Sequence, residues 1–479
     1  MRRFAALGLC LAATGALSGE VNGYADSRSA FTRARVGGLL PADDVAEATE
    51  LVEANVQVKQ RFLTRAFAYG DVSLLTQIAG TYRGLDADGN EVALANHDVA
   101  AYHPLVSLNE LYLSGEARSW LNLVAGKKRV TWGPGFAYNP TDLLNPAKDP
   151  TDPNFQRAGA YMARVELTSE TLALTLLGSP AVLEQTSGVP YQFVTYPAWD
   201  KKDDQAHYQL AARAYALVAN ADVNLMAFYG NRYRDAFEKK FRFGATFSRY
   251  FFTDYEVHFE GLFQSGSTRA AVTHACVEDA RAALACGFAG TPFVSQPLLD
   301  DATILPRVLV GARTQFSDEA MLSVEYLYQA DGYTAAQFQD LVSAFDGLSQ
   351  VAALGVPVSR IPGASLLAGG PSADGVPQKF SFEPSRRHYL FASYQKPKIR
   401  DDFTVGLVWV ENLEDLSGLV TPSVTWAAEE WLSLSLSAFV PFAGPKSLAA
   451  TAPSTGKAVS EYSMLPMAYR GLFEVRVFY

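Results

Sequence analysis

The sequence predicts an all-β fold, a transmembrane antiparallel β-barrel of about 16 strands with room for a short N-terminal helix or plug. Three observations lead to this prediction. Apolar and polar residues alternate with a period of two along many short segments. Short turns and long loops alternate between those segments, and the chain starts with a stretch typical of an export signal. A barrel of about 18 strands is the alternative, if two strands lie within residues 30–66.

Composition narrows the class of protein. Of the 479 residues 12% are aromatic, and after the first residues no apolar run reaches the roughly 18 residues of a helical membrane span. The mean hydropathy of +0.01 is typical of strands that alternate between lipid and a wet lumen. The net charge of −10 argues against nucleic acid as a partner.

Residues 1–18 are predicted to be a secretory signal peptide. Arg2 and Arg3 precede an apolar run that ends in a small-residue cleavage site before Gly19. Residues 19–70 are predicted to form an N-terminal periplasmic or plug segment, in which 45–63 fits an amphipathic helix about as well as a strand. The barrel itself is predicted to occupy residues 71–479.

The predicted wall strands are short segments bounded by turn residues. The most regular is 254–264, where Tyr255, Val257 and Phe259 alternate with Glu256 and Glu260. The predicted strands are 72–80, 108–114, 121–132, 161–167, 172–176, 207–217, 223–230, 241–250, 254–264, 307–316, 321–329, 389–395, 403–410, 416–426, 431–439 and 470–479.

The lengths of the connections support the barrel independently. The chain turns tightly near residues 116, 169, 220, 252, 318, 399 and 429, and most of the connections between those turns are long. Outer-membrane barrels have short periplasmic turns and long external loops, whereas a soluble sandwich has no reason for this two-sided rule. The loop lengths therefore favour a membrane barrel over a soluble sandwich.

The last strand, 470–479, shows the alternation on both faces. Its apolar row is Gly471, Phe473, Val475, Val477 and Tyr479, and the opposite row carries Arg470, Glu474 and Arg476. This end of the chain resembles the terminal strand of Gram-negative outer-membrane barrels, which finish on an aromatic residue. The resemblance implies a place in the cell outer membrane of a Gram-negative bacterium, contact with its lipid and lipopolysaccharide, and recognition of this strand by the barrel-assembly machinery.

Three motifs lie close together in the first third of the chain. They are NELYL at 109–113, GKKRVTWGPG at 126–135 and NPTDLLNP at 139–146. They resemble those of a group of poorly characterised Gram-negative outer-membrane β-barrel proteins of porin-like type, which share the pattern NExYL, GRQRxxWGxG and NPxDxxNP. The resemblance covers residues 108–146 and implies architecture, not solute. This chain has Lys127 and Lys128 where the pattern has Arg and Gln, which weakens any transfer of a polar contact there.

The loop that follows Trp132 contains the residues most suited to an ordered structure. Gly133 and Gly135 permit unusual backbone dihedrals, and Asn139 or Thr141 could cap a short helix. We expect the loop motif, which consists of Trp132, Gly133, Gly135, Asn139, Pro140 and Asp142, either to fold rigidly onto the barrel mouth or to form a constriction that selects solutes.

Charged residues of both signs are predicted to line the lumen. They are Glu110, Arg164, Glu166, Arg213, Arg242, Glu256, Glu260, Arg307, Arg313, Glu325, Glu474 and Arg476. They could order solutes in a narrow pore, or they could pair with one another and only hold the lumen together. No catalytic motif, no histidine pair at metal-ligand spacing and no cofactor-binding motif appears, so neither an enzyme nor a metal or other cofactor is expected.

Cys276 and Cys286 are an even pair in a chain predicted to be exported. We expect them to form one disulfide, with two free thiols as the alternative.

Two functions remain open at this point. The first is a porin-like channel, monomeric or trimeric, for passive diffusion of small hydrophilic solutes, because about 16 strands leave a lumen wide enough for water. The second is a plugged barrel that binds or exports a surface polysaccharide or lipid. The two differ in whether residues 19–66 and 331–384 fold into the lumen.

Overall fold

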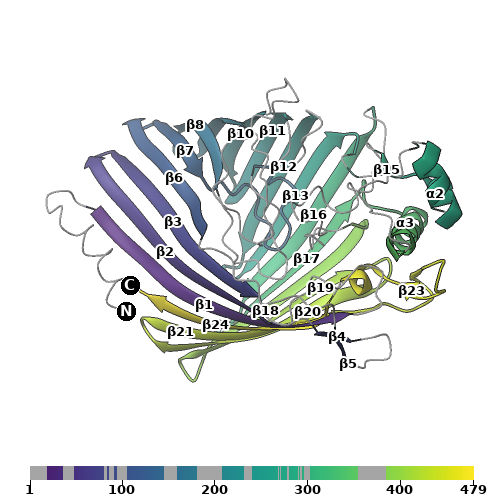
Figure 1. Ribbon diagram of the computed structural model, residues 1–479. Helices are drawn as coiled ribbons and strands as arrows, with labels where there is room; N and C mark the ends of the chain where they lie inside the picture. Colours follow the sequence, from purple (N-terminus) through teal and green to yellow (C-terminus); the bar gives the residue numbers. More distant parts are fainter. Residues whose placement is uncertain are drawn as a thin grey trace.

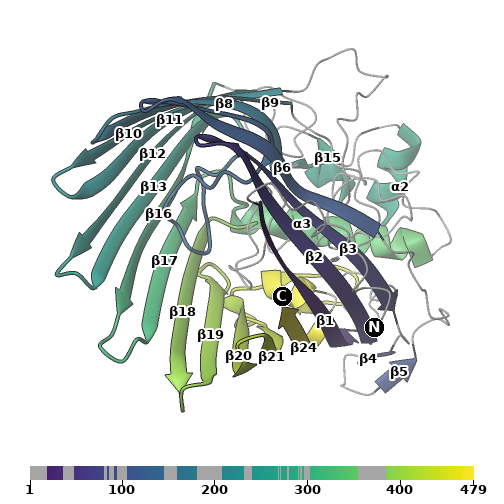
Figure 2. The ribbon, with the colours of Figure 1, turned by 90° about the vertical axis from the view of Figure 1, so that its left-hand side faces the viewer.

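The main sheet is a closed barrel. The computed structural model describes residues 19–35, 48–79, 83–85, 91–93, 105–144, 159–180, 208–230, 240–267, 269, 271–277, 280–289, 291, 294–295, 302–353, 385–465 and 467–479. Of the 20 strands in its main sheet, the short β4 and β5 lie at the margin and the other 18 form an antiparallel wall (Figures 1 and 2). The first and last of these strands pair and close the ring. The all-β barrel prediction is confirmed.

Each wall strand pairs with its neighbours in sequence. The wall strands are β1 (Gly19–Arg35), β2 (Ala48–Leu63), β3 (Ala66–Ala79), β6 (Leu105–Arg118), β7 (Leu121–Lys128), β8 (Ala160–Thr168), β9 (Leu172–Pro180), β10 (Tyr208–Val218), β11 (Ala221–Gly230), β12 (Lys240–Phe251), β13 (Tyr255–Ser265), β16 (Ile304–Gln315), β17 (Met321–Gln329), β18 (His388–Ile399), β19 (Phe403–Asn412), β20 (Ser417–Glu429), β21 (Leu432–Phe442) and β24 (Met467–Phe478). The marginal strands are β4 (Arg83–Leu85) and β5 (Glu91–Ala93).

The primary count of about 16 strands is wrong, and the alternative of 18 is right. The two additional strands are β1 and β2, so Gly19–Arg35 and Ala48–Leu63 belong to the wall and not to a plug or helix. The outward row of β1 includes Gly23, Ala25 and Ser27, which are small or hydroxylated, and this row gives little apolar alternation to detect. The predicted signal peptide, residues 1–18, lies outside the described residues.

Short connections lie at one end of the barrel and most long connections at the other. The hairpins β2–β3, β6–β7, β8–β9, β10–β11, β12–β13, β16–β17, β18–β19 and β20–β21 turn within two to five residues, at what we call the short-turn end. The chain returns at the other end, the long-loop end, mostly through longer segments. The C-terminus lies at the short-turn end and the helices α2 and α3 at the opposite end (Figure 1). This agrees with the predicted two-sided rule.

The outward face of the wall is apolar and exposed. Leu174, Leu210, Leu225, Val310 and Leu436 are each at least 40% exposed on outward rows. Aromatic side chains flank this band. At the long-loop end they include Tyr229, Phe241, Phe263, Tyr326, Trp409 and Tyr469, and at the short-turn end Trp120, Phe251, Phe252, Tyr255, Trp431 and Tyr479. An apolar band between two aromatic girdles is the surface that a bilayer requires of a barrel.

Several long loops pack together beyond the rim into a cap with its own apolar cluster. The cap contains α2 (Ala280–Ala289), α3 (Ala335–Ala353), the short helices η1 (His274–Cys276) and η3 (Glu461–Met464), and the strand pairs β14 (Ala271–Val272) with β15 (Val294–Ser295) and β22 (Ala450–Thr451) with β23 (Ala458–Val459). Phe338 and Val342 of α3 are buried against Ala452 and Met464. Among the described residues, no helix has the length and apolarity needed to cross a membrane.

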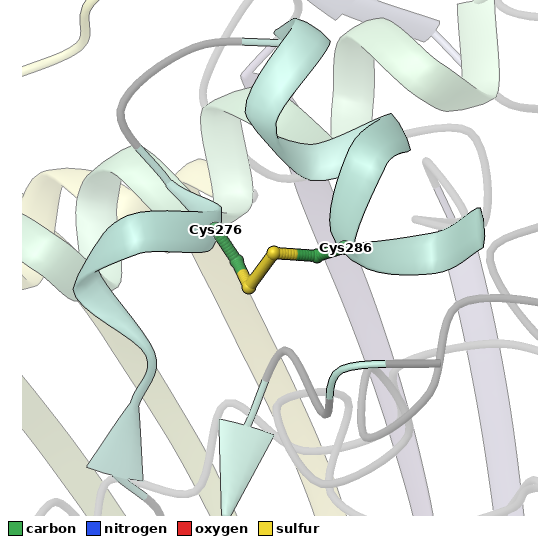
Figure 3. The surroundings of a disulfide bond; sticks show 2 residues. All are labelled: Cys276 and Cys286. Carbon is green, nitrogen blue, oxygen red and sulfur yellow. A yellow bond between two sulfur atoms is a disulfide. The ribbon is translucent and has the colours of Figure 1, made fainter. Parts of the chain in front are cut away.

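The predicted disulfide is confirmed. It joins Cys276 of η1 to Cys286 of α2, with the two Cα atoms 5.7 Å apart (Figure 3). The bridge therefore constrains a loop of the cap, and neither cysteine belongs to a wall strand.

Candidate functional site

The segment after β7 folds into the barrel. It leaves the wall at the end of β7, and its residues bond inward-facing side chains on strands far from β7. We call residues 130–144 the inward loop. It contains the predicted loop motif. The prediction that β7 runs to residue 132 is wrong, because the strand ends at Lys128 and the chain turns inward.

Apolar contacts seat the inward loop on two parts of the wall. Trp132 is 1% exposed and packs 5.4 Å from the Phe228 ring of β11, in a cluster that includes Leu144 and Leu262. Further along, Ala137 and Tyr138 pack with Leu309, Leu327, Tyr389 and Phe391 of β16, β17 and β18. The buried apolar clusters of the wall thus lie inside the ring, around the loop.

Glu260 of β13 anchors the loop on both sides of its middle. Its carboxylate is completely buried and accepts hydrogen bonds from the Gly135 N–H (2.6 Å), the Asn139 Nδ2 amide (2.9 Å) and the Thr141 hydroxyl (2.8 Å). A buried carboxylate is stable only when charged or polar donors satisfy it. The loop therefore supplies the donors that Glu260 requires, and Glu260 fixes the loop.

Glu325 of β17 anchors the middle of the loop. It is also completely buried, and it accepts the backbone N–H groups of Phe136, Ala137 (2.9 Å) and Tyr138 (3.4 Å). His258 Nε2 of β13 lies 3.1 Å from the same carboxylate. Three consecutive amides directed at one anion form a concave site typical of anion binding by the backbone.

The glycines of the motif are needed for these contacts. Gly133 has a φ of 98°, and a Cβ at this position would overlap the Glu260 carboxylate. Asn139 and Thr141 do not cap a helix in the described part of the loop, where the Asp142 N–H donates to the Asn139 carbonyl in a turn (3.1 Å). Their side chains donate to Glu260 instead, so the predicted capping role is wrong. Asp142, like the loop around it, is buried, and Pro140 is half-buried.

The strand register places all twelve predicted pore-lining residues on inward rows, but they divide into groups with different surroundings. Glu260 and Glu325 are covered by the inward loop. Arg242 donates to Gln264 (3.3 Å), and Arg307 pairs with Asp331 (2.5 Å), both in buried positions near the long-loop end. These four residues hold structure and do not face an open channel.

The other eight lie along the lumen in charge pairs. Glu166 lies 3.4 Å from Arg164 and 3.7 Å from Arg213, Glu110 lies 3.8 Å from Arg129, Glu256 pairs with Arg313, and Glu474 pairs with Arg476 (2.5 Å). Each of these charges is paired, and several remain partly exposed to the lumen; that they order solutes stays a prediction.

An acidic group on β1, β2 and β3 was not among the predicted site residues. Asp26 pairs with Arg28 and Arg476, Glu53 accepts from Ser73 (2.6 Å), and Asp71 accepts from Asn55 (2.6 Å). Glu53 and Asn55 alternate with Val52 and Ala54, which is the signal that could have identified them. They were missed because this segment had been assigned to a plug.

A cavity of 440 Å³ lies between the inward loop and the wall. It is bounded by Gly133 and Pro134 of the loop and by inward residues of β8–β12, including Arg213, Tyr215 and Asn224. These wall residues lie toward the short-turn end, so the cavity is the part of the lumen next to the loop on that side. Among the described residues, no group of three or more His, Cys, Asp or Glu side chains is arranged to hold a metal ion.

Comparisons with known proteins give matches of structure only. No protein-family model matches the chain, and no curated protein matches it in sequence. The solved structures that it resembles include OccAB1 of Acinetobacter baumannii, at 9% identity over 96% of both chains with a TM-score of 0.49. They also include OccAB3 of the same species, at 7% identity over 96% of this chain and 99% of that one with a TM-score of 0.47. OmpF of Salmonella typhi, in complex with daunomycin, matches at 8% identity over 96% and 97% with a TM-score of 0.39.

Proposed function

We propose that the chain is an outer-membrane channel through which small hydrophilic solutes diffuse passively, with the inward loop as its constriction. The observation that carries the proposal is the anchoring of that loop across the lumen by Glu260 and Glu325. The loop does not cover Glu166 and Arg213, which pair with each other and border the cavity beside it.

The location in an outer membrane is supported by the wall. Large exposed apolar patches are costly in water, whereas an apolar band between aromatic girdles matches a bilayer. The inward rows carry charges and hydroxyls, which suits a wet lumen and not a lipid-filled one. Residues 19–35 and 48–63 are part of the wall, so they do not act as the plug that the second function requires. Of the other predicted plug, residues 331–384, the described part includes α3 of the cap, and 354–384 lie outside the described residues.

Swelling of proteoliposomes in neutral sugars of increasing size tests the proposal. The purified chain should admit monosaccharides and exclude dextrans, because the loop narrows the lumen without sealing it. The folded barrel should be verified by its resistance to unfolding in detergent at room temperature. A folded barrel that admits no sugar would contradict the channel and favour the plugged barrel that binds or exports a polymer.

A further inference from the structure

His258 of β13 lies between two buried carboxylates. Its Nε2 atom is 3.1 Å from Glu325 Oε1, and its Nδ1 atom is 3.8 Å from Glu256 Oε1. The ring has room because the facing residue on β16 is Gly311, where a Cβ would overlap Nε2. The buried imidazole therefore occupies a fitted slot, with a carboxylate oxygen beside each ring nitrogen.

The charged form of the imidazole suits both of these neighbours. A neutral imidazole carries a hydrogen on one ring nitrogen and a lone pair on the other, so one nitrogen would direct its lone pair at a carboxylate oxygen. The imidazolium carries a hydrogen on each nitrogen, so it can donate to Glu325 and attract Glu256 at the same time. The geometry thus fits the protonated ring and conflicts with either neutral tautomer.

The other groups around the ring leave Glu325 dependent on it. The titratable groups that face this part of the lumen are Glu256 and Glu260 on β13, Tyr250 on β12, Arg313 on β16 and Glu325 on β17. Arg313 pairs with Glu256, and donors of the inward loop satisfy Glu260. Among the described residues, His258 is therefore the cation that Glu325 faces.

Glu325 connects the ring to the inward loop. Its Oε1 atom faces His258 and also accepts the Phe136 N–H, whereas its Oε2 atom accepts the N–H groups of Ala137 and Tyr138. A buried carboxylate is stable only while charged or polar donors satisfy it. The charge on His258 therefore acts on the same atom that holds the loop.

We propose that His258 is a positioning residue that makes the seat of the inward loop depend on pH. The protonated ring completes the anchor at Glu325. Loss of the proton leaves Glu325 without a facing cation among the described residues, so the loop opens more often. The stabilisation is present at low pH and is lost as pH rises through the range in which histidine titrates, about pH 5 to 8. The proposal rests on the proposed channel and adds a regulation of its constriction.

Two measurements on the full chain test the proposal between about pH 5 and about pH 9. The first is hydrogen exchange of the Phe136 and Ala137 amides, expressed relative to the intrinsic exchange rate at each pH. The second is single-channel current in a planar bilayer. From low to high pH, protection of the two amides should fall roughly fivefold in the wild type, since a charge-assisted hydrogen bond becomes a neutral one. The fluctuations of the current should increase over the same range.

Glu256→Gln isolates the effect of the two carboxylates. The glutamine amide can donate to a neutral Nδ1 of His258, while Nε2–H still donates to Glu325. The loop should therefore stay seated over the whole range, and protection should change by less than twofold. His258→Gln should also give a flat profile, with weaker protection than the wild type at low pH. A wild-type profile in either variant would overturn the proposal, as would flat protection in the wild type.

His388→Gln is the matched control. It removes a histidine of β18 that bonds Tyr326 (2.6 Å) and stacks against Tyr328, away from the inward loop. This variant should keep the wild-type profile, and loss of the profile would show a general effect of histidine titration on the wall and overturn the role of His258. A wild type that carries no current but retains the pH profile of its amides would instead overturn the channel function and leave the role of His258 intact.

Discussion

Gly133 shows at the scale of a single residue how the inward loop is fixed. Its positive φ and its contact with Glu260 leave no room for a side chain. Gly133→Ala should therefore lower the free energy of opening the loop by about 1–3 kcal/mol. Hydrogen exchange of the Gly135 and Thr141 amides, both bonded to Glu260, should accelerate accordingly.

Gly456 provides the matched control for this change. It also has a positive φ, of 67°, but it lies between β22 and β23 with open space around it. Gly456→Ala should carry a similar backbone penalty and leave the exchange of the inward loop unchanged. Equal acceleration in the two variants would mean that the contact with Glu260 does not hold the loop.

Val475 tests the two faces of the wall at the same scale. It lies on the outward row of β24 next to Leu434, whereas Ser435 lies beside Glu474 on the inward row. Val475→Arg should cost about 2–4 kcal/mol near the bilayer midplane, because it directs a charge at lipid. Ser435→Arg places the same side chain in the lumen and should fold normally. Unfolding midpoints in lipid measure both, and equal midpoints would contradict the assignment of the faces.

At the scale of elements, η3 attaches the β21–β24 connection to the rim. Glu461 is buried and accepts hydrogen bonds from Tyr389 (2.6 Å), Asn412 (2.7 Å) and the Ser385 N–H (2.9 Å). Burial raises the pKa of Glu461 above the ordinary carboxylate range. The raised pKa means that the folded state holds this proton more tightly than the unfolded state does.

The attachment of η3 should therefore depend on pH. The contribution of Glu461 to stability is fully present below the ordinary carboxylate pKa and is lost as pH rises through the raised value. Protease cleavage near η3 should increase with pH over that window in the wild-type protein. Glu461→Gln removes the titration and should show a flatter profile. Identical pH profiles for the two proteins would contradict this role of Glu461.

The strands that the sequence predicted well are those whose alternating pattern is contained within a few consecutive residues. Strands such as β13 and β21 alternate large apolar residues with polar ones, and this pattern is visible in a few residues. β1 was missed because the middle of its outward row, Gly23, Ala25 and Ser27, is small or hydroxylated, and because one of its partners, β24, lies at the other end of the chain. Pairing across that distance leaves no local signal.

The candidate site was predictable in composition and not in arrangement. The glycines and Trp132 were recognised as an ordered loop, and Glu260 and Glu325 as inward residues. The hydrogen bonds between the loop and these two carboxylates were not predictable, because Glu260 lies 125 residues from Gly135 and Glu325 lies 188 residues from Ala137. A period of two gives the face of a residue and says nothing of what covers that face.

At the scale of the whole molecule, the chain is a closed wall with a loop held inside its lumen. The wall is stabilised by its own strand pairing, and the loop by two buried carboxylates. Loss of one carboxylate should therefore free the loop and leave the wall closed. Each anchor contributes charge-assisted hydrogen bonds, each worth about 1.5–3 kcal/mol.

The conductance of a Glu325→Ala channel tests this account most directly. Single-channel currents of the full chain in a planar bilayer would be compared for wild type, Glu325→Ala and Glu256→Ala. Both variants remove one lumen carboxylate, but Glu256 bonds Ser248 and Arg313 of the wall and not the loop. We expect a conducting wild type, a larger and noisier current in Glu325→Ala, and an altered ion preference without a larger current in Glu256→Ala. No current in the wild type, or equal currents in both variants, would contradict it.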